Sequence, residues 1–109
     1  MSPFTGRTPL ETASNRFVQR LLATNNYLRL IRKNDNEMLD GERALSAQLE
    51  GLAPLTKQRE RVDLFTRLLP NNHLVCLVFI RPSSRAAEFE GIMRRVVSSV
   101  SINDQELKN

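Results

Sequence analysis

One stretch of this sequence limits the possible folds more than any other, the uninterrupted apolar run from His73 to Ile80. Pro70-Asn71-Asn72 precedes it and Arg81-Pro82 follows it, and proline and asparagine at such places favour turns. A short run rich in Val, Phe and Ile suits a β-strand better than a helix. We therefore predict a strand at about 73–80 that is apolar on both faces and must be covered on both.

The rest of the chain has the three- and four-residue apolar spacing of amphipathic helices. Thr8-Pro9-Leu10-Glu11 has the capping-box pattern with proline at the first helical position, which predicts a helix that begins here and runs to about residue 33. Further helices are predicted at about 36–51, 55–69 and 84–100. The end of the last one, 96–102, is rich in β-branched residues and could instead be a second strand.

The segment Asn34-Asp35-Asn36 allows two interpretations. These turn-forming residues favour an antiparallel helical hairpin. However, apolar residues from Leu10 to Leu52 keep one seven-residue phase, which also fits a single long helix and is typical of a coiled coil. Polar residues at the companion positions break the second half of that seam, so we favour the hairpin.

The predicted fold is therefore mainly α, a helical hairpin or small helical bundle with one short β-strand, in a single domain that spans 1–109. We expect 1–7 to be a flexible arm, 8–100 the helical core and 101–109 a frayed tail. A single strand leaves its ladder hydrogen bonds unmade. We expect it to pair with the same strand of a second copy, with another protein, or with 96–102, and we favour a homodimer.

Composition argues against several classes of protein. The 40% hydrophobic and 26% charged fractions are those of a globular domain, and no apolar stretch approaches the roughly 20 residues of a membrane-spanning helix. No signal-type leader is evident, so we expect a cytoplasmic protein. Cys76 and His73 are the only residues of their types, and three positions apart on a strand they point to opposite faces. Without catalytic or phosphate-loop motifs, we expect no enzyme, cofactor, metal or small-molecule substrate.

Charge is distributed unevenly along the chain. The formal net charge is +4, but residues 1–33 carry +5 and residues 34–63 carry −3. In an antiparallel helical pair these charges would flank one seam and help to select the partner. This internal use of the arginines is the interpretation we favour over a surface for phosphate.

We therefore expect a small non-catalytic protein–protein interaction module, such as an adaptor, assembly factor, chaperone or regulatory subunit, that acts as a dimer or within a complex. The predicted interface combines the strand with the apolar face of the first helix: Leu74, Val75, Leu77, Val78, Phe79, Ile80, Phe17, Leu21, Leu28 and Ile31. The alternative is a small basic nucleic-acid-binding protein that uses Arg16, Arg20, Arg29, Arg32 and Lys33. A third and weaker hypothesis is a peripheral membrane protein.

Overall fold

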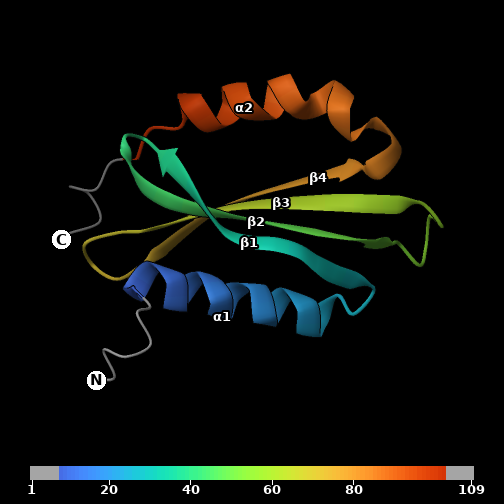
Figure 1. The fold of residues 1–109 in the computed structure, drawn as a ribbon, viewed down its shortest axis with the longest axis horizontal. Helices are drawn as coiled ribbons and strands as arrows, with labels where there is room; N and C mark the ends of the chain where they lie inside the picture. Colours follow the sequence, from blue (N-terminus) through green and yellow to red (C-terminus); the bar gives the residue numbers. More distant parts are fainter. Residues whose placement is uncertain (1–7, 103–109) are drawn as a thin grey trace.

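Four consecutive antiparallel strands form one sheet, with a helix on each face (Figure 1). The structure is a computed structural model, and it describes residues 8–102. Its elements in chain order are α1 (Pro9–Thr24), β1 (Leu28–Leu39), β2 (Glu42–Leu52), β3 (Arg59–Leu68), β4 (Leu74–Pro82), the 3-10 helix η2 (Ser83–Phe89) and α2 (Glu90–Ser99). The strand order in the sheet is the order in the chain, so each strand pairs with its neighbour in sequence.

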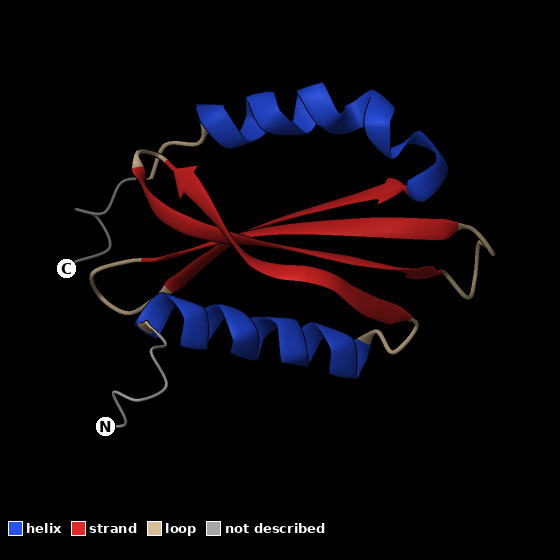
Figure 2. Cartoon of the chain, in the orientation of Figure 1, coloured by secondary structure: helices blue, strands red, loops and turns tan. Residues whose placement is uncertain are grey.

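The prediction of a mainly α fold, whether helical bundle or coiled coil, is wrong (Figure 2). The first helix ends at Thr24, and the ranges 36–51 and 55–69 that were predicted to be helical lie mostly in β1, β2 and β3. The physical reason is clearest in β2, where buried Leu45, Ala47 and Leu49 alternate with less buried polar residues. That period of two belongs to a strand. The seven-residue phase from Leu10 to Leu52 runs through α1, β1 and β2, so it does not mark one face of a helix.

The segment 34–36 is neither the turn of a helical hairpin nor part of a long helix. It lies inside β1, where the pairing with β2 shifts register between Arg32 and Asp35 and Asn34 has a positive φ of 59°. The chain instead turns at Asp40-Gly41, where both residues have positive φ, 52° and 77°. Two such residues between paired strands make a tight β-hairpin, and aspartate and glycine adopt this conformation readily.

The capping box at the start of α1 is confirmed. The Glu11 backbone N–H donates to the Thr8 hydroxyl at 3.1 Å, and the Thr8 backbone N–H donates to the Glu11 carboxylate at 2.8 Å. These two bonds satisfy backbone donors that the first turn of a helix leaves free. They fix where α1 begins.

A strand at 73–80 is also confirmed, as β4, but it is not a lone strand. It pairs along its length with β3, from Glu60 opposite Pro82 to Leu68 opposite Leu74. The segment 96–102 does not pair with it, because α2 continues to Ser99. The chain therefore supplies one neighbour for β4 by itself.

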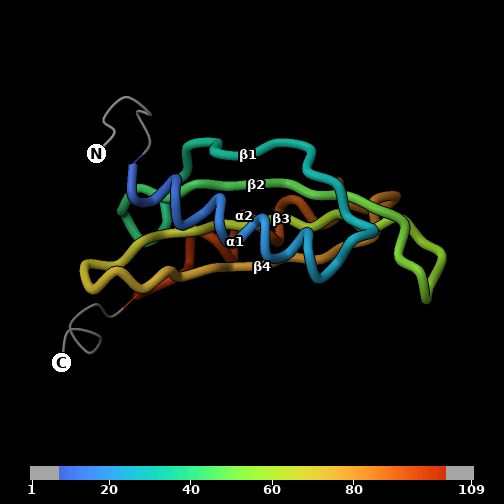
Figure 3. Tube along the Cα trace, turned by 90° about the horizontal axis from the view of Figure 1, so that it is seen from below, coloured from blue at the N-terminus to red at the C-terminus, as the bar shows by residue number. Residues whose placement is uncertain are grey.

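Each face of the sheet has its own hydrophobic core. Under α1, Val18 packs with β-strand residues such as Leu49 and Val62. Under α2, Met93 and Val97 pack with a second set that includes Phe65. Figure 3 shows α1 in front of the sheet, with β1 and β4 as its two outer strands. The central strands β2 and β3 are thus covered on both sides.

Two predictions about the ends of the chain fall mainly outside the described residues. The proposed arm at 1–7 lies outside them entirely, as does most of the proposed tail. Of that tail, Ile102 is described: its backbone N–H donates to Asp40 at 2.8 Å, and its side chain packs against the core under α2. No helix in the range 8–102 is both long enough and apolar enough to cross a membrane.

Candidate interaction edge

The outer edge of β4 is a row of backbone groups that no other strand among residues 8–102 pairs with. The Leu69 N–H donates to the His73 carbonyl at 2.8 Å in the turn that leads into β4. In an antiparallel ladder the bonding pairs alternate, so the odd-numbered residues of β4 direct their N–H and C=O groups toward β3. The even-numbered residues direct theirs to the free edge: Leu74, Cys76, Val78, Ile80 and Pro82, the last of which has a carbonyl but no N–H.

From Leu74 to Ile80, this edge lacks the features that usually protect a sheet edge. Residues 74–80 contain no charge and no proline, and their pairing with β3 has no bulge. Natural edge strands are commonly protected by charges, prolines or bulges that discourage a further strand. The other outer strand, β1, has such protection: it carries both Lys33 and Asp35 beside its register shifts. The two edges of one sheet are therefore different, and only β4 is open.

Exposed apolar side chains flank the β4 edge on both faces of the molecule. On the α1 side, Val78 and Ile80 are 45% and 64% exposed. On the other side, Ile92 and Val96 of α2 are 49% and 41% exposed and lie one helical turn apart. Ile80 and Ile92 border the same hollow, so this flank of α2 lies next to β4. We call these four side chains and the free backbone edge the β4 edge patch.

The predicted interface residues do not form one surface. Leu74, Val78 and Ile80 lie on the open side of the sheet beside α1. The residues between them belong to the core under α2: Val75, Leu77 and Phe79. The residues Phe17, Leu21 and Leu28 contribute to the core under α1, while Ile31 is half exposed on β1, at the opposite edge.

Sequence reasoning missed the α2 part of the patch. In the sequence, Ile92 and Val96 lie on one apolar face of the helix predicted at 84–100, together with Met93 and Val97. The structure buries only the latter pair. The apolar stripe on this helix is wider than a single core contact needs, and that width was the available signal.

The basic residues of the nucleic-acid alternative also fall into two groups. Arg16 and Arg20 of α1 border a hollow with Cys76, on the β4 side of that helix. The other three lie on β1 at the far edge of the sheet: Arg29, Arg32 and Lys33. Because the predicted helix through residue 33 does not exist, nothing joins the two groups into a single basic stripe.

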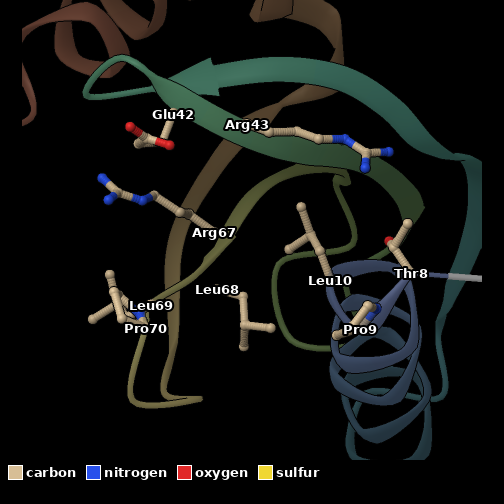
Figure 4. Close-up of a pocket in the computed structure, with 9 residues that line it drawn as sticks. All are labelled: Thr8, Pro9, Leu10, Glu42, Arg43, Arg67, Leu68, Leu69 and Pro70. Carbon is tan, nitrogen blue, oxygen red and sulfur yellow. The ribbon is translucent and has the colours of Figure 1, made fainter.

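A third hollow, at the end of the sheet, does not have the form of a catalytic site (Figure 4). Glu42 and Arg43 are successive residues of β2, so they point to opposite faces. In Figure 4, Glu42 lies on the same side as Arg67, while Arg43 extends toward the start of α1. The hollow therefore wraps around the end of the sheet, and Arg43 lies apart from Glu42 and Arg67. Within residues 8–102, no three metal-ligating side chains cluster.

Cys76 lies at the β4 edge on the same face as Val78. It is partly buried, and burial raises the pKa of its thiol. A raised pKa keeps the thiol protonated near neutral pH, which is the opposite of what a nucleophilic cysteine needs. Cys76 is best understood as an apolar member of the strand.

Comparison with protein-family models, with curated proteins and with solved structures finds no match for this chain. The function is therefore inferred from the geometry of the β4 edge patch.

Proposed function

We propose that this protein is a small, non-catalytic protein–protein interaction module that docks a protein partner on the β4 edge patch. It acts as a dimer or within a complex, in the role of an adaptor, assembly factor, chaperone or regulatory subunit. The observation that carries this proposal is the open, uncharged edge of β4 with exposed apolar side chains on both of its flanks. A cytoplasmic location agrees with a single unpaired cysteine.

Two physical terms favour docking at this edge. A strand added to a sheet edge gains a ladder of main-chain hydrogen bonds, and side-chain contacts on either face then select the partner. The side chains of Val78, Ile80, Ile92 and Val96 are apolar surface that a partner would remove from water, at about 25 cal/mol per Å². Neither term requires the protein to have a reactive group.

A charge at Ile80 tests the proposal. Ile80→Lys places an ammonium group on the edge strand, as natural edge strands do to prevent pairing. Met38→Lys is the matched control, because Met38 is 59% exposed on the protected strand β1. Each tagged protein is purified from its native source, and the intact mass of the resulting complex is measured. We expect wild type and M38K to retain a stoichiometric second polypeptide, and I80K to lose it.

Two outcomes would overturn the proposal. One is a wild-type protein that remains a monomer at high micromolar concentration and carries nothing with it. The other is equal loss of the partner in I80K and M38K. Circular dichroism of each variant confirms that the fold is retained.

A further inference from the structure

We infer that the partner at the β4 edge patch is a second copy of this chain, joined by antiparallel pairing of the two β4 strands with Leu77 on the two-fold axis. The result is a continuous eight-stranded sheet, two four-stranded sheets joined edge to edge. This inference rests on the proposed function and specifies its partner.

The hydrogen-bonding pattern of β4 determines the register. Only the even-numbered residues present free backbone groups, so they must pair with even-numbered residues of the other copy. An axis at Cys76 sets Ile80 opposite the partner's Asn72, which lies outside β4. An axis at Val78 sets Leu74 opposite the partner's Pro82, which has no N–H, so that pair can form only one of its two hydrogen bonds. An axis at Leu77 places Leu74 opposite the partner's Ile80 and Cys76 opposite the partner's Val78. It is the register in which Leu74, Cys76, Val78 and Ile80 each form a pair with both of its hydrogen bonds.

The side chains are compatible with this register. Leu74, Cys76, Val78 and Ile80 all lie on the α1 side of the sheet, so the register covers exposed Val78 and Ile80 with Cys76 and Leu74 of the other copy. No residue of the strand between Leu74 and Ile80 is charged, so the two β4 strands bring no like charges of their own together over this range. The nearest cation on the strand, Arg81, is buried and bonded to Asp63.

The β4 edge patch extends from the edge of the sheet to the helix layer above it, and this extent favours a second copy over an extended peptide. A bare strand could pair with the edge, but it would not reach the helix layer in which Ile92 and Val96 are exposed. A two-fold axis perpendicular to the sheet puts α2 of both copies on the same face. The second copy therefore brings a helix with the same exposed stripe to the flank of the first.

Disulfide cross-linking between the two copies can show which residues of the two β4 strands lie opposite each other. Residues opposite each other in a hydrogen-bonded pair have Cα atoms about 5.5 Å apart, within the range of a disulfide, whereas diagonal neighbours are about 7–8 Å apart. In Val78→Cys, the new cysteine faces native Cys76 of the other copy in both halves of the dimer. In Ile80→Cys, the matched control, the new cysteine faces Leu74. After mild oxidation of the purified proteins, we expect a cross-linked fraction for V78C on the order of tenfold above I80C and wild type.

The possible results separate the alternatives. Either of two results would show another register and overturn the inference. One is a cross-link between the two native Cys76 thiols in wild type. The other is a cross-link between Cys76 and the introduced cysteine in I80C that exceeds the cross-link in V78C. A protein that sediments as a monomer at all concentrations would overturn it as well. If that monomer still carries a different polypeptide from its native source, which I80K loses, the proposed function stands and only the identity of the partner is wrong.

The helix layer has its own test. Ile92→Asp puts a carboxylate into the stripe that faces the second copy, and Ser98→Asp puts one on the opposite flank of α2, which borders a hollow with Met38. Sedimentation equilibrium should show the dimer weakened on the order of tenfold or more by I92D and unchanged by S98D. Equal effects would show that α2 does not take part and would favour a bare strand as the partner.

Discussion

Of the three glycines that the structure describes, Gly51 leaves the least room for a side chain. It pairs with Leu28 at the start of β1, and a Cβ atom there would overlap the carbonyl oxygen of Tyr27. Because that obstacle is backbone, Gly51→Ala requires the chain at Tyr27 to move. We expect a loss of about 1–3 kcal/mol in the free energy of unfolding, measured by urea denaturation.

Gly91 provides the control for that substitution. It lies within α2, and a Cβ atom there would have no neighbour within 4 Å. Gly91→Ala should therefore stabilise the protein by about 0.5–1 kcal/mol through helix propensity alone. If both variants shifted stability in the same direction, the close approach at Gly51 would not be the cause.

Tyr27 allows a residue-level test of electrostatics. Burial, a hydrogen bond from its hydroxyl to Glu60 at 3.0 Å and the negative charge of Glu60 all raise its pKa. Because the folded value lies above the unfolded one, stability is lost as the pH rises from the ordinary tyrosine pKa through the folded pKa. This is the only tyrosine in a chain without tryptophan, so phenolate absorbance reports it alone.

We expect Glu60→Gln to lower the absorbance midpoint part of the way to the ordinary tyrosine value, since burial remains. Glu42→Gln, at the exposed start of β2, should leave the midpoint unchanged. An unchanged midpoint in E60Q would show that Glu60 does not interact with the phenol in solution.

At the scale of elements, Arg81 joins four of them. It donates to Asp63 of β3 through Nε at 3.1 Å and Nη2 at 2.9 Å, to the carbonyl of Ala86 in η2 at 2.6 Å, and to Glu90 of α2 at 3.2 Å. Arg81 and Asp63 are both nearly inaccessible to water. This pair anchors the chain where it leaves the sheet for α2.

Removing one partner of that pair should cost more than removing both. Arg81→Met leaves the Asp63 carboxylate buried with Gln48 as a remaining donor, and we expect a loss of about 3–5 kcal/mol. The double variant Arg81→Met, Asp63→Leu leaves no buried unpaired charge and should recover part of that loss. Urea denaturation of both single variants and the double completes the cycle. A double variant that lost the sum of the single effects would show that the pair is not coupled.

The elements differ in how far their sequence determines them. The start of α1 could be predicted because its capping residues act locally, and β4 because a short β-branched run between prolines has few alternatives. The leucines of β2 did not distinguish a strand from a helix, because the spacing of Leu45, Leu49 and Leu52 also fits a helix. Asp40-Gly41 was the local signal that decides between the two, since that pair strongly favours a hairpin.

At the scale of the whole molecule, the prediction failed where it depended on which elements pack against each other in the tertiary structure. The sequence predicted that 73–80 must be covered on both faces and needs a strand to pair with, but it did not identify β3 as that strand. Leu74, Val78 and Ile80 were predicted as interface residues because they belong to the apolar run 73–80. Ile92 and Val96 were not, because only the tertiary structure shows which flank of α2 lies beside β4.

The agreement between strand order and chain order also has a consequence for how the protein folds. Every sheet contact joins segments that are close in sequence, which keeps the relative contact order low for a β-rich domain and favours rapid folding. During synthesis each strand meets a neighbour that has just been made, and β4 is the last to be added. Its outer edge is complete only when the rest of the sheet exists, so we expect the docking that we propose there to follow folding.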